Sequence, residues 1–295
     1  MNILKHYEDY KIIYADIVQG KTWCDEYSCY VKHFTDIDYA KLIRRKSRYT
    51  EYLIKEGLQT EAQKLVTLKE QGVWGDKEED DILSLKYIIS DNTKIVEKMP
   101  VPQQRAPIEA IIKSKREELA KLEYRRSQLI EPTVEYYSLR YYGTIFPQAA
   151  MFKDEALTIP LYSESQYDDM EDDDVAKINS AYIKTLEPFS DRNFRILACL
   201  PIVINQVSLC KKNVFAYYGK PLVDFTLYQH DVLSKTLRNL NIMEQSEGEP
   251  PEIDEGTSVQ DLLDWYDLNY SVLLGKRNSG SQDSGVKTSK TYVKK

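Results

Sequence analysis

The sequence predicts a mainly α-helical protein with a small N-terminal antiparallel β-hairpin, a long antiparallel αα-hairpin that is coiled-coil-like, and a C-terminal helical bundle. Two heptad-spaced apolar stripes flank a proline-rich break. Glycine is sparse, with 11 in 295 residues, which is typical of helices. One N-terminal region is rich in β-branched and aromatic residues. We expect five segments: a β-hairpin element at 1–34, a helical segment at 35–78, the helical hairpin at 79–131, a helical domain at 132–274 and a disordered basic tail at 275–295.

The helical hairpin is predicted from two matching stripes, at 82–99 and 108–129. In each stripe the apolar positions follow one another at alternating steps of three and four residues, which places them on one helix face. Folding the stripes together about 100–107 also brings the polar residue of one, Asn92, against the polar residue of the other, Lys115. Two readings stay open: the hairpin packs on the body of the protein, or it is an arm that grips another chain. The predicted facing pairs are Met99 with Ile108, Val96 with Ile112, Ile89 with Leu119, Leu85 with Leu122, and Ile82 with Arg126.

The N-terminal region from 10 to 34 predicts two or three short antiparallel strands. Residues 11–18 are β-branched and aromatic and precede a turn at Gly20. Residues 22–24 and 27–34 then form a second candidate pair of strands around a tight turn. A lone hairpin is marginal in water, so we expect these strands to pack on helices or on another copy of the chain.

The same region contains the best metal-site candidate, which consists of Cys24, Cys29 and His33. Zinc sites usually have closer cysteine spacing and a fourth ligand, and neither is present. We therefore predict no bound metal. Cys199 and Cys210 lie in an apolar helical stretch and are predicted core residues.

The rest of the chain is predicted to be helices separated by turns. Thr35, Ser190 and Thr226 are candidate N-caps. The acidic run 168–174 is predicted to be a solvated loop that caps the next helix. The expected helices are 35–57, 60–71, one from 132 that ends by 143–147, 175–186, 192–209 with a kink at Pro201, 226–243, and 259–274 after a linker at 246–257.

Composition excludes several classes of function. A net charge of −7 argues against a nucleic-acid binder. No apolar run is long enough to span a membrane, and four cysteines in a chain this long do not indicate a secreted disulfide scaffold. No glycine-rich nucleotide loop or nucleophile motif is present. We predict a non-enzymatic protein of a reducing cytoplasm with no cofactor.

Tyrosine is over-used, with 23 Tyr against 7 Phe. Its apolar ring and polar tip suit surfaces that become covered in a complex. A codon-biased genome explains the excess equally well. Association with further copies of the chain stays open. The candidate partner-binding residues are Tyr87, Ile88, Ile95, Ile111, Tyr124, Tyr217, Tyr218 and Trp265.

The order of these features resembles a family of tailed-bacteriophage proteins, the tail assembly chaperones. The resemblance covers about two-thirds of the chain in outline. It consists of the N-terminal hairpin that ends at 30–35 (YVKHFT), a short helical stretch that closes at 70–74 (EQGVW), an acidic start to a charged helical hairpin, and the motifs at 218–222 (YGKPL) and 227–229 (LYQ).

The resemblance implies a bacteriophage protein in the host cytoplasm that binds a tail component, such as the tape-measure protein, before virion assembly. Such proteins shield apolar helical segments through protein–protein interaction. The first alternative is a structural virion component, a baseplate or neck subunit, which would remain in the particle. The second alternative is a metal-dependent enzyme that uses Cys24, Cys29 and His33.

Overall fold

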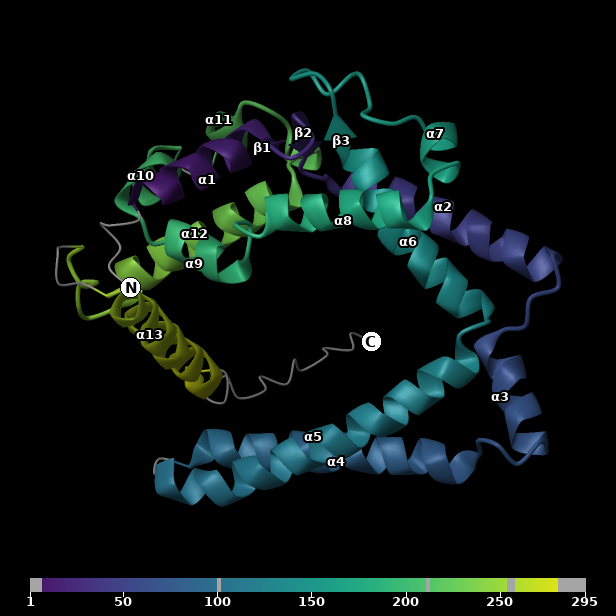
Figure 1. Ribbon diagram of the computed structural model, residues 1–295. Coiled ribbons are helices and arrows are strands. Elements are labelled where there is room, and N and C mark those ends of the chain that lie inside the picture. Colours follow the sequence, from purple (N-terminus) through teal and green to yellow (C-terminus); the bar gives the residue numbers. More distant parts are fainter. Residues whose placement is uncertain (1–6, 100–101, 211–212, 254–257, 281–295) are drawn as a thin grey trace, which may run out of the picture. The chain divides into compact units, whose positions relative to one another are not determined.

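The computed structural model describes residues 7–99, 102–210, 213–253 and 258–280. The chain forms two compact units (Figure 1). Unit 1 combines Met1–Tyr39 with Pro147–Lys295, and unit 2 is Ala40–Phe146. The protein is mainly helical with a small antiparallel sheet, as predicted. Every helix among the described residues is too short or too polar to cross a membrane.

Unit 1 begins with helix α1, Tyr7–Gln19, where the sequence analysis predicted a strand at 11–18. That prediction was wrong because it weighed β-branched content above periodicity. Tyr10, Tyr14 and Ile17 recur at steps of four and three residues, and all three are buried on one helix face. The helix ends at Gly20, whose positive φ of 76° allows the chain to turn.

The sheet has the order β1-β2-β3 and is antiparallel throughout. Strands β1, Lys21–Cys24, and β2, Cys29–Lys32, form the predicted tight hairpin. The third strand, β3, Met151–Phe152, comes from a stretch that was expected to be irregular. Its pairing with β2 joins segments far apart in the chain, which a local sequence pattern does not reveal.

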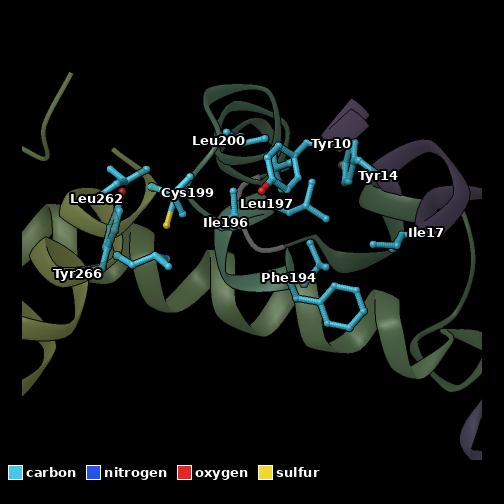
Figure 2. Close-up of a cluster of buried hydrophobic side chains, with 14 of the residues drawn as sticks. Tyr10, Tyr14, Ile17, Phe194, Ile196, Leu197, Cys199, Leu200, Leu262 and Tyr266 are labelled. Atoms are coloured by element: carbon cyan, nitrogen blue, oxygen red, sulfur yellow. The ribbon is translucent and has the colours of Figure 1, made fainter. Parts of the chain in front are cut away.

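The core of unit 1 joins α1 to α9, α10, α12 and α13 (Figure 2). Tyr10 and Ile17 of α1 pack with Leu197 in this cluster. Trp265, one of the candidate partner-binding residues, packs partly buried against the same cluster. The helices of this unit are α7 Glu164–Asp168, α8 Asp172–Leu186, α9 Asp191–Leu197, α10 Pro201–Leu209, α11 Val214–Tyr218, a 3₁₀ turn η2 at Leu222–Asp224, α12 Leu227–Gln245 and α13 Val259–Gly280.

Helix α12 is positioned by its first turn. Thr226 caps it, and Gln229 closes the reciprocal capping box. The buried Gln229 side chain also donates from Nε2 to the Ile17 and Val18 carbonyls at 2.8 and 3.0 Å. One side chain thus satisfies the last carbonyls of α1 and fixes α1 beside α12.

Several helix boundaries in unit 1 differ from those predicted. Helix α8 begins at Asp172 rather than at 175, so the second half of the acidic run 168–174, which was expected to be a loop, forms its first turn. The helix expected at 192–209 is two helices, because Pro201 begins α10 and Leu200 before it is extended, with ψ 137°. The last helix continues to Gly280, so the predicted tail at 275–295 is helical at its start. The remainder of that prediction, 281–295, lies outside the described residues.

Unit 2 contains the predicted hairpin, with two helices before it in the chain and one after it. Helix α6 was expected to end by 143–147 but continues to Ala150, because packing of the buried Ile145 outweighs the single hydrogen bond that Pro147 removes. Helices α2 and α6 each contain a boundary between the units. The helices of this part are α2 Asp36–Lys55, α3 Glu61–Glu70, α4 Asp76–Lys98, α5 Pro102–Ile130 and α6 Val134–Ala150.

Candidate functional site

The candidate site is the hairpin of α4 and α5, which lie side by side (Figure 1). The predicted stripe residues are all buried or half-buried, whereas most of the described residues between them are exposed. Val96 and Ile112, a predicted facing pair, line one groove together. Helix α5 begins at Pro102 rather than after Pro107, because proline is well placed at a first helical position.

The polar positions of the two stripes are satisfied within their own helices. The Asn92 amide donates to the Ile88 carbonyl at 2.8 Å. The Lys115 ammonium pairs with Glu118 at 2.7 Å. Both side chains are half-buried and each has a partner within its own helix, so the facing of Asn92 and Lys115 across the seam stays a prediction.

The base of the hairpin is covered by α3 and the loop after it. Trp74 is 2% exposed and packs with Leu68 of α3 and Ile82 of α4. The Arg125 guanidinium lies 5.6 Å from the centre of the Trp74 ring and makes a cation–π contact with it. Partly buried residues packed against this cluster are Leu65, Leu119, Leu122 and Leu129.

A charged cluster closes the same end. The predicted mismatch of Ile82 with Arg126 is resolved by two carboxylates: Arg126 Nε lies 2.7 Å from Glu79 Oε1, and Arg126 Nη2 lies 2.6 Å from Glu61 Oε1. The Trp74 indole also donates to Glu79 at 2.6 Å. Burial disfavours the Glu79 carboxylate, but these hydrogen bonds outweigh burial and lower its pKa.

Glu79→Ala should destabilise the hairpin by about 1–3 kcal/mol, because it leaves Trp74 without its acceptor and Arg126 with one partner. The matched control is Asp80→Ala, an exposed acid in the same turn, for which we expect a change within about 0.5 kcal/mol. Amide hydrogen exchange in α4 and α5 measures both. Equal effects of the two substitutions would show that the cluster contributes nothing.

The distal half of the hairpin, residues 88–120, carries a groove of ≈ 470 Å³. Its floor includes the stripe residues Val96 and Ile112, and its lining is mostly apolar. Two helices alone leave the apolar seam between them partly open. At the base of the hairpin α3 and the loop after it cover the seam, and in the distal half the groove lies beside it. The groove is lined by Thr93, Val96, Glu109, Ile112, Lys113, Arg116, Glu117 and Ala120.

The other side of the distal half also carries apolar residues. Ile95 and Ile111 each come one residue before a seam position, which places both on the side away from the groove. They are 40% and 48% exposed. Tyr87 and Tyr124 are exposed on the outer helix faces, at 72% and 66%, and Ile88 is half-buried. Five of the predicted partner-binding residues therefore lie on the hairpin.

The three remaining predicted partner-binding residues lie in unit 1 and pack internally. The Tyr217 hydroxyl lies 2.8 Å from that of Tyr14, and Tyr218 donates to the Gln229 carbonyl at 3.4 Å. Trp265 packs edge-on against Tyr266, with ring centres 4.9 Å apart. Partner binding by these three residues stays a prediction.

The metal-site candidates do not come together as a set of three. Cys24 and Cys29 are direct partners across β1 and β2, and both are buried. Burial raises the pKa of Cys29 to about 12, which disfavours the thiolate that a metal requires. His33 packs among aromatic rings instead. In the part of the chain that the structure describes, no three His, Cys, Asp or Glu residues form a metal-binding group. Cys199 is a core residue as predicted, whereas Cys210 is only half-buried.

Sequence reasoning missed the groove, and one signal was available. The lining residues Thr93 and Ala120 are small, and each directly follows a seam position. Small residues there leave space beside a heptad seam. Comparison with protein-family models, curated proteins and solved structures finds no match to this chain.

Proposed function

We propose that the protein is a non-enzymatic binding protein of the tail assembly chaperone kind, which holds an apolar helical segment of a phage tail component in the distal groove of its hairpin. The groove itself carries the proposal, because its lining between two helices includes the half-buried seam residue Val96 beside the buried Ile112. The phage-tail part of the proposal rests on the sequence resemblance alone.

A helix fits this groove better than an extended strand. The groove follows two long helices whose side chains repeat every three to four residues, so an amphipathic helix can insert its own apolar stripe. An extended peptide would need free backbone groups along a sheet edge, which helices do not offer. The groove therefore favours a partner segment with apolar residues at helical spacing.

Charged residues on the rim of the groove determine which charge pattern in a partner segment is complementary. Along α5, Glu109 and Glu117 flank the basic residues Lys113 and Arg116. Partner side chains of the opposite order would pair with them, and other orders would place like charges together. We expect selectivity from this rim more than affinity.

The test is capture of tail proteins from phage-infected cells by the purified protein. Ala120→Arg places a long side chain in the groove and should abolish capture if the groove is the binding site. Ile111→Glu places a charge on the apolar side opposite the groove and tests that side instead. Leu83→Glu is the matched control, since Leu83 is 65% exposed and lies outside both surfaces. The proposal requires capture of a tail component by the wild type and by Leu83→Glu but not by Ala120→Arg.

Mass spectrometry of purified virions separates the two phage roles. A chaperone is absent from the particle, and a baseplate or neck subunit is present at fixed stoichiometry. Unchanged capture by Ala120→Arg would show instead that the hairpin is a scaffold and that binding occurs elsewhere.

A further inference from the structure

His33 is a buried polar residue that the proposed function does not use. It follows β2, and its side chain is 2% exposed. Neither ring nitrogen has a hydrogen-bond partner among the described residues. An unpaired buried polar group destabilises the folded state, so such a group in a native fold requires an explanation.

Aromatic rings enclose the imidazole. Phe189 and Tyr228 lie edge-on to it, with ring centres 4.6 and 4.9 Å away, and they stack on each other at 5.1 Å. A neutral imidazole carries one N–H and one acceptor nitrogen. The N–H can point at an aromatic face, which is a weak acceptor. The acceptor nitrogen needs a hydrogen donor, and the rings supply none.

A small cavity of ≈ 20 Å³ adjoins this ring. A cavity needs about 10–15 Å³ to hold one water molecule, so this one has room for a single water. Three of its lining residues are tyrosines, from α2, α8 and α12. The cavity is lined by Lys32, His33, Phe34, Tyr39, Tyr182, Leu186, Leu227 and Tyr228.

The tyrosine hydroxyls stay protonated. Burial raises the pKa of Tyr228 to about 12, and it raises the pKa of Tyr182 in the same direction, with a further contribution from Tyr228. A neutral phenol donates and accepts hydrogen bonds but is a poor metal ligand. The surroundings therefore suit a neutral guest that both donates and accepts.

We propose that this cavity binds one internal water molecule, which donates to the acceptor nitrogen of His33 and hydrogen-bonds to the tyrosine hydroxyls around it. The water supplies the hydrogen-bond partner that His33 otherwise lacks, at the place where the end of β2 meets the start of α12. That place is already fixed by the backbone bond from Leu227 N to the Phe34 carbonyl at 2.9 Å. A water with such partners is a structural component of the fold.

A crystal structure at atomic resolution tests the proposal. We expect one density peak about 2.7–3.2 Å from a His33 ring nitrogen in the wild type. In His33→Phe, which keeps the ring size, the peak should be absent. A tyrosine hydroxyl bonded directly to His33, a metal ion in the cavity, or a peak that persists in His33→Phe would overturn it.

A solution measurement covers the case in which the variant does not crystallise. The nuclear Overhauser effect between the His33 ring protons and bound water should show a long-lived contact in the wild type. Tyr30→Phe is the control, since Tyr30 lies on β2 just before His33 but does not line the cavity, and it should leave the contact unchanged. Absence of the contact in the wild type would refute the water site.

Discussion

Leu85→Asp unfolds the helical hairpin. Leu85 is 5% exposed in the seam, so the substitution removes a buried apolar side chain and places a carboxylate in its position. The two effects together should cost about 4 kcal/mol or more. Amide hydrogen exchange should show loss of protection throughout α4 and α5, and partner capture should disappear with it.

Leu83→Asp is the control for this substitution. Leu83 lies two residues away on the same helix but is 65% exposed, so the cost should stay within about 0.5 kcal/mol. If α4 and α5 keep wild-type protection in Leu85→Asp, the seam does not hold the hairpin together. The same substitution at Ile89 or Leu119 should act in the same direction with a smaller effect, because both are half-buried.

Mild acid destabilises unit 1 through His33. Burial lowers the pKa of His33 to about 3, against 6.5 in an exposed chain. Below pH 6.5 the unfolded chain binds a proton that the folded state does not, so stability falls as the pH falls. The slope is about 1.4 kcal/mol per pH unit, which gives a loss of about 2 kcal/mol between pH 6.5 and 5. Urea unfolding at a series of pH values measures it.

His33→Phe separates this residue from other titrating groups. The phenyl ring fits the same aromatic surroundings and binds no proton, so the loss of stability between pH 6.5 and 5 should largely disappear. The slope is the readout, and it remains informative even when the variant changes stability at neutral pH. An unchanged slope in His33→Phe would mean that another group causes the acid sensitivity.

The hairpin could be predicted because its information is local. Seam spacing and the proline break fix two helices and their pairing within 53 residues, 79–131, of continuous chain. The N-cap at Thr226 was predictable for the same reason, since it depends on its own first turn. Patterns of this kind do not need the rest of the fold.

Other features depend on contacts between distant segments and were not predictable. The residues of α1 favour a strand by composition. The segment is nevertheless helical, because a helix buries Tyr10, Tyr14 and Ile17 together against other helices. Strand β3 exists only because β2 lies beside it. His33 was considered with the cysteines because they are near in sequence, whereas its actual neighbours are Phe189 and Tyr228.

Photo-cross-linking from the distal groove tests the central claim most directly. A photoreactive residue at Ala120, in cells that produce the phage tail proteins, should form an adduct with an apolar helical segment of a tail component. The same residue at Leu83, outside the groove, should form none. Equal adducts from both positions, or no adduct from Ala120, would contradict the account.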